Sequence, residues 1–217
     1  MKRLLVLFSL SCVAAPITAQ AECPYSVIDP YPNGLYASQM LAFKPGYWIQ
    51  TRGPMAKGWR KMKRKRKLHH TRRMYPSKRV LGCPKPTLDT SLTLGHEGFV
   101  IVGPAKCFKN GKGPDIIIHE PRSEMNLNET FNVYVTPDKN GIGPWYQIAA
   151  KAAVSNANNY FELELDGIVN ERGFPITEFS WIKIQDANSQ LVMSHERYSG
   201  FEVSAVKFMH QCGIPMS

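Results

Sequence analysis

Four acidic residues near the ends of apolar segments are the first candidates for chemistry in this sequence. Asp115 follows a glycine-rich turn at residues 110–114, Glu120 lies five residues later, and Asp186 and Glu202 lie near the ends of two later segments. Calcium binds six to eight oxygen ligands, often carboxylates together with turn carbonyls. These residues therefore predict a structural Ca²⁺ site. Positions 115 and 120 have opposite parity, so they share a site only if the strand end bends. The alternative is that both residues cap turns or face solvent.

A basic segment at residues 52–79 is the second candidate. It contains thirteen Lys and Arg residues and no Asp or Glu, whereas the rest of the chain after residue 21 has a net charge of about −5. A segment selected only for solubility more often mixes the two signs of charge. Such a run favours binding to polyanions, with an affinity that falls as salt rises. The residues predicted to bind are Trp59, Arg60, Lys61, Lys63, Arg64, Lys65, Arg66, Lys67, Arg72 and Arg73.

The partners predicted for this segment are anionic glycans, anionic lipid headgroups or nucleic acid. At an anionic bilayer each Lys or Arg contributes about 1 kcal/mol, and Trp59 with Met55 and Met62 is suited to the headgroup level. Charge alone does not distinguish these partners. The alternative interpretation is a solvated linker or a processing site, because dibasic sequences are readily cleaved by proteases.

Residues for hydrolytic chemistry do not form a recognisable motif. Three His-Glu dipeptides begin at His96, His119 and His195, but none has the spacing of an HExxH zinc site. The run at residues 194–196 is contiguous, whereas the members of a catalytic triad converge from separate parts of a chain. The sequence also contains no GxSxG motif. We therefore predict no catalytic residues and a protein that is not an enzyme.

The N-terminus predicts export. Lys2 and Arg3 precede a short apolar stretch at residues 4–15, and residues 19–21 offer small side chains at the positions that a signal peptidase reads. We therefore predict a signal peptide at residues 1–21 and a product secreted through the periplasm of a bacterium. No later stretch of the sequence is long and apolar enough to span a membrane.

The cysteines predict two disulfides. Cys12 leaves with the signal peptide, which leaves Cys23, Cys83, Cys107 and Cys212 in an oxidising compartment. Four cysteines allow three pairings. We expect Cys83 to pair with Cys107, which would close a loop of the size of a β-hairpin. We expect Cys23 to pair with Cys212, which would link the two termini. No pair has the spacing of a zinc site.

Short segments rich in β-branched and aromatic residues recur from residue 80 onward, separated by Gly, Pro, Asn and Asp. Some alternate as half-buried strands do, and others are continuous apolar runs, typical of strands covered on both faces. Eight such strands without alternating helices predict an all-β fold, an antiparallel β-sandwich. The expected strands are residues 91–94, 98–102, 115–119, 130–136, 145–149, 159–165, 181–185 and 200–208.

The chain before this domain is expected to be irregular. Residues 22–51 are rich in Pro, Tyr and Gly, which is typical of turns, with one short helix at residues 35–43. The basic segment is expected to be flexible or helical, because its like charges repel and little apolar area offsets the ordering entropy. The β-sandwich domain is expected at residues 80–217.

Motifs between residues 92 and 206 resemble a family of secreted bacterial cell-surface β-sandwich modules. The most specific is the turn NGKGPD at residues 110–115, followed by an apolar β run and Glu120. The segments FNVYVTPDKNG at 131–141, WIKIQD at 181–186 and GFEVSAV at 200–206 also match. The resemblance implies a jelly-roll, galactose-binding-like sandwich used for extracellular ligand binding. The chain departs from the family in the last motif, where Glu202 and Ser204 replace residues that are usually Asp.

Together these features predict a secreted binding protein, such as an effector or surface-attachment factor. It would recognise a glycan or another host or envelope surface ligand through the sandwich loops, while the basic segment attaches to polyanions. One alternative is an exported hydrolase with catalytic carboxylates on its loops, which predicts a deep cleft. The other is a structural component of an envelope assembly, which predicts an acidic partner protein.

Overall fold

The computed structural model describes residues 23, 31, 33–49, 68–70, 77–87, 90–121, 129–154, 159–187 and 200–213, with the backbone alone at 47–49 and 68–70. These residues form antiparallel β-sheets and include a short 3-10 helix at Ser77–Val80, and they contain no α-helix. The prediction of an all-β, antiparallel fold is confirmed. None of the described residues belongs to a helix long and apolar enough to cross a membrane.

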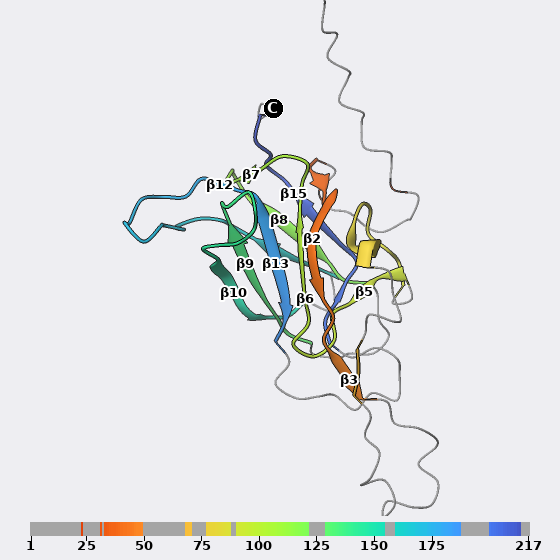
Figure 1. Cartoon of the computed structure of the whole chain (residues 1–217). Helices are drawn as coiled ribbons and strands as arrows, with labels where there is room; N and C mark the ends of the chain where they lie inside the picture. The colour runs from red at the N-terminus through yellow and green to blue at the C-terminus, as the bar shows by residue number, and fades with distance from the viewer. Residues whose placement is uncertain are drawn as a thin grey trace, which may run out of the picture.

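The larger sheet has five strands in the order β10-β9-β13-β6-β2 (Figure 1). Buried and partly buried side chains alternate along β9 and β13, because successive residues of a strand point to opposite faces and one face packs on the core. Four of its strands lie where the sequence predicts them. The bounds are Tyr146–Ala152 for β10, Phe131–Thr136 for β9, Trp181–Asp186 for β13, Phe99–Gly103 for β6 and Gln39–Lys44 for β2.

A second sheet has four strands in the order β1-β15-β8-β11. Every residue of β8 and β15 is buried, as expected for the continuous apolar run at residues 116–118. Its strands are Leu35–Tyr36 (β1), Ala205–Phe208 (β15), Ile116–His119 (β8) and Tyr160–Leu163 (β11).

Three two-stranded pairs complete the β structure. β5 (Leu92–Thr93) pairs with β14 (Glu202–Val203), and β7 (Phe108–Lys109) pairs with β12 (Glu178–Phe179). β3 (Tyr47–Ile49) pairs with β4 (Leu68–His70). All eight expected strands are therefore present, and the expected strand at 200–208 is divided by Ser204 into β14 and β15.

The helix expected at residues 35–43 is wrong, and so is the expectation that the N-terminal segment is irregular throughout. β1 pairs with β15 at one edge of the four-stranded sheet, and β2 pairs with β6 at one edge of the five-stranded sheet. An edge strand presents unpaired N–H and C=O groups, and the N-terminal segment satisfies them by adding one strand to each sheet. The sheets therefore include residues before Val80, the expected start of the β domain.

The hydrophobic core combines buried residues of both larger sheets. Phe131 of β9 is fully buried and stacks on Phe201, with ring centroids 4.0 Å apart. The ring of Phe161 in β11 lies edge-on to Phe131 at 5.4 Å. Since β9 and β11 belong to different sheets, Phe131 is a point at which the two sheets contact each other.

The prediction of two disulfides is confirmed, but the predicted pairing is wrong. The bonds join Cys23 to Cys83 and Cys107 to Cys212. Cys107 directly precedes β7 and does not pair locally with Cys83. It lies instead beside the end of the chain, where Cys212 N–H donates to its carbonyl oxygen over 2.9 Å.

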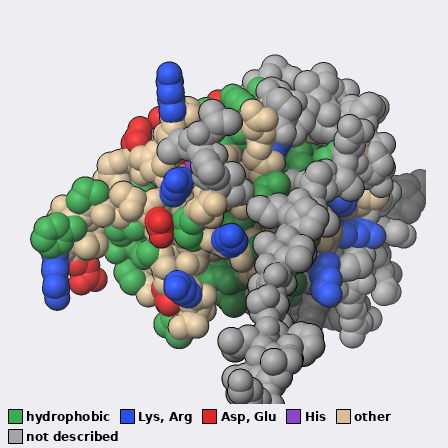
Figure 2. Space-filling view, turned by 90° about the horizontal axis from the view of Figure 1, so that it is seen from above, with side chains coloured by type: hydrophobic (Ala, Val, Ile, Leu, Met, Phe, Trp, Pro, Cys, Tyr) green, Lys and Arg blue, Asp and Glu red, His purple; other side chains and the backbone are tan. Residues whose placement is uncertain are grey.

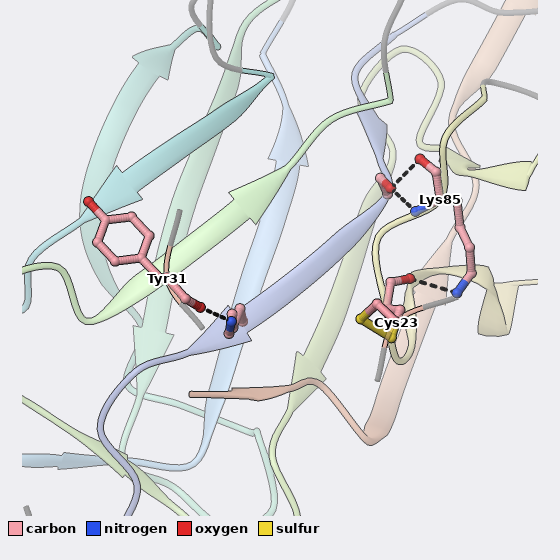
Figure 3. The surroundings of a disulfide bond; sticks show 6 residues. Cys23, Tyr31 and Lys85 are labelled. Carbon is pink, nitrogen blue, oxygen red and sulfur yellow. Dashed lines mark hydrogen bonds between the residues drawn. A yellow bond between two sulfur atoms is a disulfide. The ribbon is translucent and has the colours of Figure 1, made fainter. Parts of the chain in front are cut away.

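The turn after Cys83 is bound to the start of β15 (Figure 3). The Lys85 N–H donates to Ser204 Oγ, and that hydroxyl donates to the Lys85 carbonyl over 2.8 Å. The Lys85 ammonium donates to the carbonyl of Cys83 over 2.6 Å. Ser204 therefore has a structural role in anchoring this turn.

Candidate functional site

Three carboxylates meet near strand ends of both larger sheets, and Glu202 is more than 70 positions from the other two in the sequence. Glu120 follows β8, Glu129 precedes β9, and Glu202 begins β14. One carboxylate oxygen of each lies within 4.8 Å of those of the other two. Glu129 and Glu202 are buried, with exposed fractions of 5% and 4%, and Glu120 is partly exposed. We call these residues the glutamate cluster.

The backbone around the cluster holds its members in place. The N–H of Glu120 donates to the Asn159 carbonyl over 2.9 Å, which fixes the end of β8 against the start of β11. Glu202 lies opposite Thr93 in the β5–β14 pair, and the Thr93 hydroxyl is 3.5 Å from Glu202 Oε1. Glu120 and Glu202 are therefore held by paired backbone.

Burial and like charge both disfavour ionisation of these glutamates. Burial raises the pKa of Glu120 to about 8, with a further contribution from the charge of Glu129. Burial also raises the pKa of Glu129 to about 7, and the charge of Asp186 adds to this effect, whereas hydrogen bonds from Glu202 and from the Gly200 N–H oppose it. The pKa of Glu202 is raised well above its ordinary value, first by burial and then by Glu129. The cluster therefore favours bound protons, or a bound cation, over three unneutralised carboxylates.

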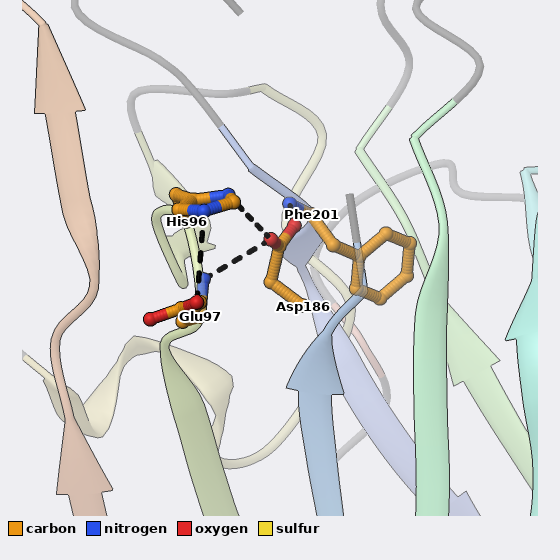
Figure 4. Close-up of polar contacts among 4 residues, drawn as sticks. All are labelled: His96, Glu97, Asp186 and Phe201. Atoms are coloured by element: carbon orange, nitrogen blue, oxygen red, sulfur yellow. Dashed lines mark hydrogen bonds and ion pairs between the residues drawn. The ribbon is translucent and has the colours of Figure 1, made fainter. Parts of the chain in front are cut away.

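Asp186, at the end of β13, acts electrostatically on Glu129 and Glu202. Its own two carboxylate oxygens contact other neighbours, which Figure 4 shows. One oxygen accepts from the Phe201 N–H over 3.0 Å, and the other accepts from the Glu97 N–H over 3.3 Å. The His96 ring nitrogen Nδ1 lies 3.9 Å from the second oxygen. Asp186 therefore ties two turns to the end of β13, and its charge acts on Glu129 and Glu202 from outside the cluster.

Asp115 does not belong to the glutamate cluster. Its carboxylate accepts from the Gly111 N–H over 2.7 Å and from the Leu165 N–H over 2.8 Å, and His210 Nε2 lies 3.8 Å away. The structure does not bring Asp115 together with Glu120, because Asp115 directly precedes β8 and Glu120 directly follows it, which places them at opposite ends of that strand. Asp115 instead closes the glycine-rich turn, the alternative use that its sequence position allows.

Glu129 is the member that the sequence analysis missed. No motif marks it, but it precedes Phe131 by two residues and therefore shares the core-facing parity of Phe131, Val133 and Val135. An acidic residue in register with the buried positions of a strand is a signal that could have identified it.

A second group that could offer metal ligands consists of Cys107, Cys212 and Glu178. The two cysteines form a disulfide with each other, so neither sulfur is available as a thiolate. This group is a covalent link between the chain end and β7 and is no candidate for a metal site.

The ten residues predicted to bind polyanions, at positions 59–61, 63–67, 72 and 73, lie outside the described residues. The chain on either side of most of them is described. β3 ends at Ile49 and pairs with β4, which begins at Leu68, so residues 50–67 connect two hydrogen-bonded strands. Nine of the thirteen basic residues of the segment belong to this connection. In addition, the Cys23–Cys83 disulfide closes a loop that contains all thirteen.

Neither a protein-family model nor a curated protein matches this sequence.

The glutamate cluster predicts an unusual pH dependence of stability in a buffer that contains a chelator. Between the ordinary glutamate pKa of 4.5 and the raised value of about 8 for Glu120, the folded state holds protons that the unfolded state has lost. The free energy of unfolding therefore falls as pH rises through this window, by about 1.4 kcal/mol per pH unit for each extra proton held. Urea unfolding at pH 5 and pH 7.5 measures this difference.

The matched variant for this measurement is Glu129→Gln, which removes one carboxylate from the cluster and keeps its shape. We expect a smaller loss of stability between the two pH values than in the wild type. A wild-type protein that becomes more stable from pH 5 to pH 7.5 would contradict the interpretation.

Proposed function

We propose that this chain is an exported, non-enzymatic binding protein in which a β-sandwich presents a basic connection to polyanions. The observation that carries the proposal is the pairing of β3 with β4. Because Ile49 and Leu68 lie opposite each other in this pair, the nine basic residues between them begin and end at one place on the molecule. Charge that is concentrated in this way favours contact with several anionic groups at once.

The sandwich arrangement of the two larger sheets is part of the proposal. It is supported by the contact between Phe131 of β9 and Phe161 of β11 and by the shared hydrophobic core. Alternating burial in β9 and β13 also agrees with a sheet that covers a core on one face. The similarity to secreted jelly-roll modules is a further argument for this arrangement.

Export is supported by the two disulfides, which persist in oxidising compartments, and by the predicted signal peptide at residues 1–21. On the face in Figure 2 several Lys and Arg side chains lie apart from one another with acidic side chains near some of them, and others lie close together on the right. Electrostatic attachment is expected to come from the basic segment, in which thirteen Lys and Arg residues have no acidic residue among them.

Affinity for heparin tests the proposal, with anionic vesicles and duplex DNA as comparison probes. For a duplex polyanion, six to ten phosphate contacts correspond to a loss of about 10³–10⁵ in affinity between 50 and 200 mM salt. We expect the affinity of the wild type for the probe that it binds most tightly to fall steeply as the salt concentration rises. Binding that survives high salt would instead measure recognition of a glycan by the sandwich loops.

Two variants that lose the same net charge test whether heparin binding depends on where the basic residues lie. Each variant replaces six basic residues with Gln. The first changes Lys61, Lys63, Arg64, Lys65, Arg66 and Lys67. The second changes exposed residues of the described body, Lys44, Lys106, Lys112, Lys139, Lys151 and Arg172. We expect only the first variant to lose heparin binding and the salt dependence. Equal losses in both would show that net charge alone acts, and retention in both would remove the basic segment from the proposal.

A further inference from the structure

We propose that Glu120, Glu129 and Glu202 form a binding site for a divalent cation, with Ca²⁺ as the preferred ion. This site is independent of the basic segment. It also differs from the site expected from the sequence, because it includes Glu129, excludes Asp115 and leaves Asp186 as an outer neighbour.

The state of Glu129 is the observation that points to a ligand. Its side chain is 5% exposed, and its Oε1 is buried without a hydrogen-bond partner. A buried polar atom without a partner is costly, and more so when the group is charged. Within the described part of the chain, no Lys or Arg forms an ion pair with any member of the cluster. A cation among the three carboxylates would supply the missing partner.

The donor atoms favour a hard cation. All three side chains offer carboxylate oxygens, which Ca²⁺ prefers, and a glutamate can bind through one or both oxygens. Calcium–oxygen distances of about 2.3–2.6 Å place oxygens on opposite sides of the ion roughly 5 Å apart. One carboxylate oxygen of each glutamate lies within 4.8 Å of those of the other two, which is close enough for all three to bind one ion. Mg²⁺ requires shorter distances and a stricter octahedral geometry.

Binding at this place would link the two larger sheets. Glu120 follows β8 of the four-stranded sheet, whereas Glu129 precedes β9 of the five-stranded sheet. Glu202 lies in β14, just before β15. Glu120 is partly exposed, so the ion can enter from its side. A cation that contacts all three would hold strand ends from both sheets together and would stabilise the folded state by mass action.

Calcium titration of the full chain, freed of metal with a chelator at pH 7.5, tests the proposal by calorimetry and thermal unfolding. At 100 times the dissociation constant, a ligand bound only to the folded state stabilises by about 2.7 kcal/mol. For a chain of this size this corresponds to a rise of about 5–10 °C in Tm. We expect Mg²⁺ to give a smaller rise. A wild type with neither binding heat nor a change in Tm up to 10 mM Ca²⁺ would overturn the proposal.

Variants identify the ligands and exclude a merely structural role. Glu129→Gln is expected to weaken Ca²⁺ binding at least tenfold, while the metal-free variant is as stable as the wild type or more stable, because a buried like charge is gone. The control is Glu164→Gln, which neutralises an exposed glutamate and should keep the full response. A Glu129→Gln protein that keeps wild-type Ca²⁺ affinity would overturn the assignment.

If Glu129→Gln does not fold, Glu120→Gln at the partly exposed side of the cluster provides the same test with the same expected loss. Heparin binding by whichever variant folds should remain at the wild-type level. A loss of calcium binding with heparin binding intact supports the cation site separately from the polyanion proposal, and intact calcium binding in both glutamate variants refutes it.

Discussion

Replacing Phe131 with alanine is expected to lower the free energy of unfolding by about 3–5 kcal/mol. Phe131 is fully buried, stacks on Phe201 and touches Phe161 across the two larger sheets. Its removal deletes a large apolar group and leaves a cavity that neighbours in paired strands cannot fill without breaking hydrogen bonds. Urea unfolding of the oxidised protein measures the change.

Phe174→Ala is the matched control, because it makes the same chemical change at a side chain that is 63% exposed. Its effect should lie within about 0.5 kcal/mol of zero. If both variants lost similar stability, or if Phe131→Ala lost less than 1 kcal/mol, the contact between sheets at Phe131 would not be a main source of stability.

The second large effect is expected from the double variant Cys107→Ser, Cys212→Ser. The disulfide spans 105 residues, and a closed loop of about 100 residues restricts the unfolded chain enough to contribute about 4.7 kcal/mol in the chain-entropy model. The folded state keeps the pairing around it, including the hydrogen bond from the Lys109 N–H to the His210 carbonyl. The loss should therefore come mainly from the unfolded state, and urea unfolding without reductant measures it.

Free thiols provide the control for this variant. The thiols are counted in protein that lacks residues 1–21 and therefore Cys12. Cys107→Ser with Cys212→Ser leaves the Cys23–Cys83 bond intact, so this protein should contain no free thiol when unfolded. Cys83→Ser with Cys107→Ser removes one partner from each bond and should leave two free thiols and a greater loss of stability. Two free thiols in the first variant would contradict the observed pairing.

The strand predictions are correct where the hydrophobic pattern of a segment matches the burial of that segment in the fold. The alternation at residues 131–135 and the apolar run at 116–118 reflect burial on one face and on both faces, so each could be recognised without its partners. β1 and β2 carried no such signal. Their Pro- and Tyr-rich surroundings indicate turns, and they became strands because distant sheet edges were available for pairing.

The candidate site was predictable only in part, for a similar reason. Glu120, Asp186 and Glu202 are near strand ends in the sequence, and the fold brings Glu120 and Glu202 together with Asp186 beside them. Glu129 could be placed on the core side by parity, but its meeting with Glu120 and Glu202 depends on how β8, β9 and β14 are arranged. Asp115 was assigned incorrectly because the turn hydrogen bonds that occupy its oxygens form only after the chain folds.

By itself, the sequence determined the class of fold, the presence of two disulfides and the separation of a basic segment from a mildly acidic remainder. These properties depend on residue types and on the alternation of apolar and polar residues along short segments, both of which can be read without knowing the tertiary contacts. Only the tertiary structure decided which cysteines pair, that the N-terminal strands complete both sheets, and which carboxylates share a buried space. Most of these outcomes depend on contacts between residues far apart in the sequence, such as the disulfides, which join residues 60 and 105 positions apart. The closure of such long loops is favourable only when the whole core forms.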